Sequence, residues 1–119
     1  MAKIMVVEDE EKYMARIARI VGEKGHVLSQ FRTPRKALAA YDEERPDMVI
    51  TDYTGFPLDG VGLTRGIRDR GDEIPVYIQS QTRPEEKEFQ YSGATGFMPK
   101  EGIEEQLPVI LQTHFGDAQ

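Results

Sequence analysis

Five short apolar runs alternate with longer amphipathic segments along the chain, and this alternation restricts the possible folds more than any other feature. The runs occupy residues 3–7, 26–31, 47–51, 75–79 and 95–99. Their length and composition are typical of buried strands, whereas the segments between them carry apolar residues at helical spacing. Strands that alternate with helices favour a parallel sheet covered on both faces. The sequence therefore predicts an α/β fold, a three-layer sandwich of five strand–helix units with strand order 2-1-3-4-5.

Helices are expected over residues 10–24, from Pro34 onward, over 60–70 and over 84–92, with a closing helix marked by Ile103, Leu107, Ile110 and Leu111. Pro108 lies inside that last pattern, so the closing helix either kinks there or begins near Leu107.

Length and composition limit the classes of function. A chain of 119 residues is expected to form one domain, residues 1–119, with its core in 3–112. A net charge of −6 argues against direct contact with nucleic acid or anionic lipid. No apolar run approaches the ~20 residues of a membrane-spanning helix. The absence of cysteine is compatible with a cytoplasmic location, which is the expectation here.

Polar and charged residues follow the expected strands at one end of the sheet. Glu8 and Asp9 follow 3–7, Asp52 follows 47–51, and Ser80 and Lys100 follow the last two strands. Carboxyl ends of parallel strands share one edge, so three carboxylates would crowd there and attract a hard cation such as Mg²⁺. The set suits phosphoryl transfer to Asp52, with the metal and Lys100 neutralising phosphoryl oxygens and Ser80 donating a hydrogen bond.

Four stretches carry a resemblance to a known family: IMVVEDE, PDMVITDYTGFPLDG, IPVYIQSQ and GATGFMPK. In this order and spacing they resemble the receiver domain of two-component response regulators, a CheY-like, flavodoxin-like fold, over residues 3–112. The resemblance implies that Asp52 accepts a phosphoryl group from a sensor histidine kinase or phosphotransfer protein. It also implies a role for each matching residue: Glu8, Asp9, Asp52 and the backbone carbonyl of Thr54 for Mg²⁺, Lys100 for the phosphoryl group, Ser80 and Phe97 for switching.

The output expected from the resemblance is a change of the surface formed by residues 84–111. This surface would contact a downstream protein or output domain, and a homodimer through it is an open alternative. Such a receiver is a switch rather than an enzyme, because it catalyses only its own phosphorylation and dephosphorylation.

The sequence departs from the family pattern at four places. Glu8 stands where aspartate is commoner, Pro57 stands one position later than usual, Glu101 replaces the proline that commonly follows the lysine, and Gln81 replaces a small residue. Gln81 is expected to overhang the phosphorylation site and to alter access to it.

Other interpretations stay open at this point. Asp52 could merely start a turn, Glu10 and Glu11 are expected to be acids at a helix start, and Phe97 could be permanent core. A phosphorylation-independent binding module of the same fold is the main alternative. A flavin carrier is disfavoured by the acidic EDEE segment, and a dehalogenase-type phosphatase by Thr54, where that class needs a second aspartate. The chain could be a complete regulator or the receiver of a longer protein.

Overall fold

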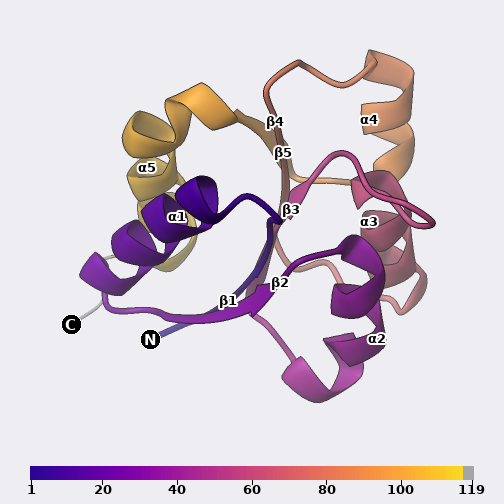
Figure 1. Ribbon diagram of the computed structural model, residues 1–119. Coiled ribbons are helices and arrows are strands. Elements are labelled where there is room, and N and C mark those ends of the chain that lie inside the picture. Colours follow the sequence, from indigo (N-terminus) through magenta and orange to yellow (C-terminus); the bar gives the residue numbers. More distant parts are fainter. Residues whose placement is uncertain (117–119) are drawn as a thin grey trace.

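A five-stranded parallel sheet lies at the centre of the computed structural model, which describes residues 1–116 (Figure 1). The strand order is β2-β1-β3-β4-β5, so the predicted α/β sandwich is confirmed. The strands are β1 (Lys3–Val7), β2 (Val27–Phe31), β3 (Met48–Asp52), β4 (Val76–Ser80) and β5 (Gly96–Pro99).

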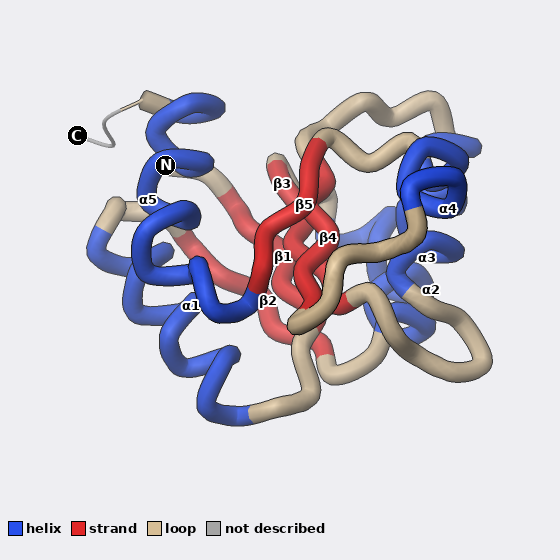
Figure 2. The backbone as a smooth tube through the Cα atoms, turned by 90° about the horizontal axis from the view of Figure 1, so that it is seen from above, coloured by secondary structure: helices blue, strands red, loops and turns tan. Residues whose placement is uncertain are grey.

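Helices cover both faces of the sheet. They are α1 (Glu11–Glu23), α2 (Pro34–Glu44), α3 (Gly60–Asp69), α4 (Glu86–Ser92) and α5 (Ile103–Phe115), with a short 3₁₀ turn, η1 (Lys100–Gly102), before α5. Helices α1 and α5 lie together on one face, and α2, α3 and α4 lie on the other (Figures 1 and 2). This three-layer arrangement leaves the strand ends uncovered.

Local sequence explains where two of the helices begin. The side chain of Thr33 accepts a hydrogen bond from the backbone N–H of Lys36, and Pro34 follows in the first turn of α2. Asp59 caps α3 in the same way by accepting from the N–H of Gly62. Both are favoured N-cap residues because their oxygens satisfy backbone donors that a first turn leaves unpaired.

Helix α5 runs through Pro108 and begins at Ile103, so the alternative start near Leu107 is wrong. Proline removes one backbone donor from a helix. Ile103, Leu107 and Leu111 nevertheless form a continuous buried face on α5. Packing of that face against the sheet and α1 outweighs the loss of one hydrogen bond.

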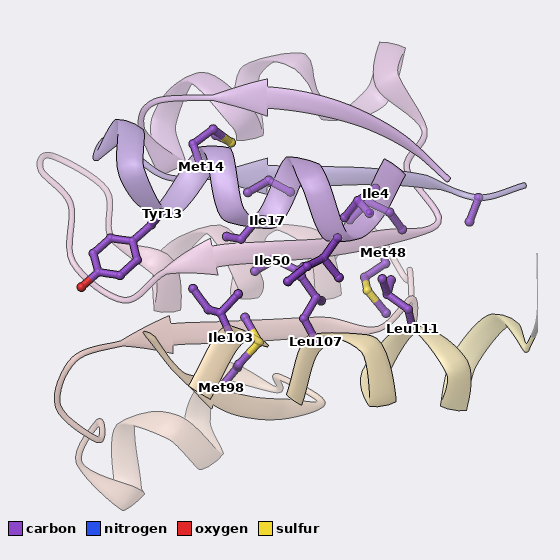
Figure 3. Packing of buried hydrophobic residues seen from close by; sticks show 14 residues of the cluster. Ile4, Tyr13, Met14, Ile17, Met48, Ile50, Met98, Ile103, Leu107 and Leu111 are labelled. Atoms are coloured by element: carbon purple, nitrogen blue, oxygen red, sulfur yellow. The ribbon is translucent and has the colours of Figure 1, made fainter. Parts of the chain in front are cut away.

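The core divides into two clusters because successive strand residues point to opposite faces of the sheet. On β1, Ile4 and Val6 pack with α1 and α5, whereas Met5 and Val7 pack under α2 and α3. Figure 3 shows the first cluster, in which Tyr13 of α1 stands at the end toward which the strands run. Its hydroxyl therefore leaves the apolar core near the carboxyl edge of the sheet.

Strand β3 extends through Asp52, one residue beyond the predicted end at residue 51. Asp52 is the partner of Gln79 in the parallel register of β3 and β4. Its backbone is thus part of the sheet while its side chain stands at the sheet's edge.

Contacts at the amino edge of the sheet hold the start and the end of the described chain close together. The backbone N–H of Ala2 donates to His26 Nδ1 at 2.9 Å, and the His26 ring lies 5.3 Å from the ring of Phe115 at the end of α5. These contacts lie at the edge opposite the polar strand ends. Within residues 1–116, none of the helices combines the length and apolar character needed to cross a bilayer.

Candidate functional site

The carboxyl edge of the sheet brings together the side chains that the sequence placed at strand ends. Asp52 ends β3, Ser80 ends β4, Lys100 follows β5, and Glu8 and Asp9 follow β1. Asp52, Ser80 and Lys100 line one pocket of about 270 Å³. The other lining residues are Glu10, Tyr53, Thr54, Gln79, Gln81 and Thr82.

Lys100 links the two buried carboxylates of this site. Its Nζ lies 3.0 Å from Asp52 Oδ1 and 3.0 Å from Glu8 Oε1, and its side chain is only 9% exposed. A longer contact of 3.7 Å reaches Glu10 Oε2. Lys100 thus points into the site although Glu101, not proline, follows it.

Glu8 is held by donors from three directions. Its Oε2 accepts from the backbone N–H of Glu10 at 2.9 Å, and its Oε1 accepts from Gln79 Nε2 at 2.9 Å. The third donor is Lys100, and together these contacts compensate the burial of a charge. The side-chain direction of Glu8 is therefore fixed.

Electrostatics around Asp52 favour its protonated form before any cation is added. Burial raises the pKa of Asp52 to about 7, helped by the hydrogen bond and negative charge of Glu8, while Lys100 opposes the rise. Burial would lower the pKa of Lys100, but its hydrogen bonds and ion pairs with Glu8 and Asp52 outweigh this and raise it. The site thus holds a charged lysine beside a carboxylate that gains from further positive charge.

Three acidic side chains next to this pocket can hold a metal ion. Carboxylate oxygens of Glu8, Asp9 and Glu10 lie within 4.8 Å of one another. Among the described residues they are the one His/Cys/Asp/Glu group with this spacing, and hard cations such as Mg²⁺ prefer such oxygen ligands. Glu10 was expected only at the helix start, and the structure places it with the metal-ligating candidates. Asp52, in contrast, is not in this group and faces Lys100.

The remaining predicted residues lie around the pocket. Thr54 is exposed in the loop after β3. Ser80 is half-buried, and its hydroxyl oxygen accepts from the N–H of Thr82 at 3.3 Å. Phe97 lies on β5, half-buried, with the Arg83 guanidinium 5.4 Å from its ring centroid. It borders a separate hollow of about 180 Å³ beside α4.

Sequence reasoning missed two residues of this site. Gln79, fully buried on β4, donates from Nε2 to both Glu8 Oε1 and Asp52 Oδ1, at 2.9 and 3.3 Å. Tyr13 lies under Lys100, whose Nζ is 4.7 Å from the ring centroid, and its hydroxyl accepts from Gln81 Nε2 at 3.1 Å. An amide inside an otherwise apolar central strand was the available signal for Gln79.

Gln81 lines the pocket, as its position after Ser80 led us to expect. Its hydrogen bond to Tyr13 ties the loop after β4 to helix α1. That loop is therefore anchored at one end beside the site.

Comparison with known proteins identifies the family to which this chain belongs. The sequence model of the response regulator receiver domain matches residues 4–112, so this chain belongs to the response regulator receiver family. The two-component response regulator PhoP of Pseudomonas aeruginosa is 28% identical over 124 residues, which cover 98% of this chain and 55% of PhoP. Three other curated response regulators are covered over only 16–46% of their length.

Solved structures agree on the fold. The Vibrio cholerae chemotaxis protein CheY4 superposes with a TM-score of 0.86 at 24% identity, covering 97% of this chain and 99% of CheY4. The receiver domain of the sensor histidine kinase PA1611 from Pseudomonas aeruginosa gives 0.84 at 22% identity, covering 97% of this chain and 98% of that domain. The latter was solved with a magnesium ion coordinated in its active-site cleft.

Proposed function

We propose that this receiver domain accepts a phosphoryl group on Asp52 and acts as a phosphorylation-dependent signalling switch. The observation that carries the proposal is the 3.0 Å contact between Lys100 Nζ and Asp52 Oδ1 in a pocket lined also by Ser80. A nucleophilic carboxylate, a fixed cation and a hydroxyl donor within one pocket are the groups that phosphoryl transfer requires.

In the proposed transfer, a carboxylate oxygen of Asp52 forms a bond to phosphorus. The bond from phosphorus to the donor breaks at the same centre, and the leaving group keeps the electron pair. That leaving group is the imidazole of a phosphohistidine or the carboxylate of a small acyl phosphate. Lys100 favours the charged form of Asp52 and can then donate to a phosphoryl oxygen, as can the hydroxyl of Ser80.

We propose Mg²⁺ as the cofactor of this site. Glu8, Asp9 and Glu10 offer oxygens at metal-holding spacing, and Asp52 and Thr54, expected as further ligands, line the adjoining pocket. When bound, Mg²⁺ supplies positive charge that offsets the charge of the phosphoryl oxygens. The pKa of Asp52, raised to about 7, supports a site completed by a cation.

The proposed donor is a sensor histidine kinase or phosphotransfer protein in the cytoplasm. The proposed output is the α4–β5–α5 surface, through a change in Ser80 and Phe97, toward a downstream protein or output domain or a second copy of the chain. The exposed setting of α4 and the half-buried Phe97 are compatible with this role. We further propose that residues 1–119 act as one receiver unit, without direct contact with nucleic acid or membrane.

A second candidate is a binding module of the same fold that does not use phosphate. The hydrogen bond between Gln81 and Tyr13 favours it, because it restrains the loop that borders the pocket. This candidate retains the fold and the surface but leaves Asp52 unmodified.

Intact mass distinguishes the two candidates. The protein is incubated with Mg²⁺ and a small acyl phosphate, with Asp52→Asn and an EDTA-treated sample alongside. We expect the wild type incubated with both Mg²⁺ and the acyl phosphate to gain one phosphoryl group, and we expect no gain in Asp52→Asn or in the EDTA-treated sample. If neither the acyl phosphate nor a phosphorylated histidine kinase modifies the wild type, the phosphate-independent module is the better description.

A further inference from the structure

We infer that Gln79 is a positioning residue that selects which oxygen of Asp52 receives the phosphoryl group. The inference rests on the proposed function and adds a residue to it. Gln79 lies one position before Ser80 on β4, and its side chain points to the same face of the sheet as its register partner Asp52.

The contacts of Asp52 are unevenly divided between its two oxygens. Oδ1 accepts a hydrogen bond from Gln79 Nε2 at 3.3 Å and forms an ion pair with Lys100 Nζ at 3.0 Å. Among residues 1–116, the hydrogen bond and the ion pair of the Asp52 side chain are both made by Oδ1, and Asp52 lines the pocket. The geometry thus leaves Oδ2 as the oxygen available to attack phosphorus.

The surrounding carboxylates fix the orientation of the Gln79 amide. Its NH₂ group faces Glu8 and Asp52, and the opposite orientation would place its oxygen against both negative charges. In the observed orientation Oε1 is buried and has no partner among the described residues. An unpaired buried acceptor destabilises the fold, so stability alone does not explain a glutamine here.

Fixing one oxygen matters because rotation of an aspartate carboxylate about χ2 is only weakly restricted. Two donors from different strands, Gln79 on β4 and Lys100 after β5, hold Oδ1 from two sides. Rotation that brings Oδ1 to the phosphorus would break both contacts. Pre-orientation of a nucleophile in this way raises the rate of the transfer.

The test uses Gln79→Met, which keeps the length of the side chain and removes its donor. Gln112→Met makes the same change on the exposed side of α5 and serves as the control. With a small acyl phosphate at saturating Mg²⁺, we expect the rate of mass gain to fall about tenfold in Gln79→Met and to stay unchanged in the control. Gln79→Met also takes a donor from the buried carboxylate of Glu8, so we expect its melting temperature to fall while the protein stays folded, and the rates are compared below that temperature.

A spectroscopic measurement on the Mg²⁺-free protein tests the contact without any reaction. The side-chain ¹⁵NH₂ resonances of Gln79 should exchange slowly with solvent and should shift in Asp52→Asn. Resonances typical of a free glutamine side chain would overturn the inference, whether or not Gln79→Met folds.

The outcomes separate the inference from the function on which it rests. If the wild type gains a phosphoryl group and Gln79→Met does so at the same rate, the role of Gln79 is wrong and the receiver function stands. If the wild type gains no phosphoryl group from either kind of donor, the proposed function fails and the role of Gln79 fails with it.

Discussion

The floor and the rim of the pocket are built in opposite ways. The floor consists of Glu8, Asp52, Gln79 and Lys100, all buried and joined by contacts of 2.9–3.3 Å. The rim consists of residues 54–57 and 81–83, which are exposed. Its side-chain contacts are few, namely Gln81 to Tyr13 and Arg83 over Phe97. A buried polar network tolerates little change because each member satisfies another, whereas an exposed loop can vary at small cost.

Loss of the cation from the floor should have the largest effect. Lys100→Met leaves Glu8 and Asp52 without their shared cation and removes the positive charge that the proposed function places beside the phosphoryl group. We expect the rate of phosphorylation by a small acyl phosphate to fall by about 100-fold. Lys36→Met, an exposed change on α2, is the matched control. A rate within threefold of the wild type, measured by intact mass, would contradict this role of Lys100.

Removal of the negative charge of Asp52 should stabilise the folded protein at high pH. The folded-state pKa of Asp52, raised to about 7, exceeds the ~3.9 of an unfolded aspartate, so the native protein binds this proton more tightly. The stabilisation that the native protein gains from binding this proton is complete below about pH 4 and is lost as the pH rises through about 7.

In EDTA at pH 8, Asp52→Asn should therefore be more stable than the wild type, by roughly 2 kcal/mol. The difference should shrink toward pH 4. Urea unfolding at several pH values measures it, and the opposite trend would show that Lys100 compensates the charge of Asp52 fully.

Substitutions that remove the hydrogen bond between the rim and helix α1 should have only a small effect on stability. Gln81→Ala and Tyr13→Phe each remove the same hydrogen bond, and Tyr13→Phe keeps the ring under Lys100. We expect each to lower the free energy of unfolding by about 0.5–1 kcal/mol and the double variant to lose no more than one hydrogen bond. Additive losses in urea unfolding would mean that the two side chains act independently.

The smallest effect is expected at the tip of the rim. Phe56 is 92% exposed, so Phe56→Ser removes little packing. The free energy of unfolding should change by less than about 0.5 kcal/mol. A larger loss would indicate that the loop 54–57 packs on the domain in solution.

The fold and the location of the site could be predicted because both follow from topology. Apolar periodicity identified the five strands, and parallel strands bring Glu8, Asp52, Ser80 and Lys100 to one edge regardless of side-chain detail. The observed strand ends differ from the predicted ones by a residue, as at Asp52, because pairing with the neighbouring strand decides where a strand stops.

The connections inside the site could not be predicted in the same way. Gln79 and Glu8 lie 71 positions apart, and their hydrogen bond depends on which way a buried amide turns. The sequence predicts only an acid at a helix start for Glu10, whereas the structure places its carboxylate beside those of Glu8 and Asp9. Such contacts depend on rotamers and on pairwise electrostatics, which a single sequence does not specify.

The contacts of His26 with Ala2 and Phe115 have a consequence for protein engineering. They bring the two ends of the described chain together on the edge opposite the pocket. A circular permutant that bridges these ends with a short linker would keep every strand in place and could open the chain in the exposed rim. A reporter inserted there would sit beside Asp52 while the sheet that positions the aspartate remains intact.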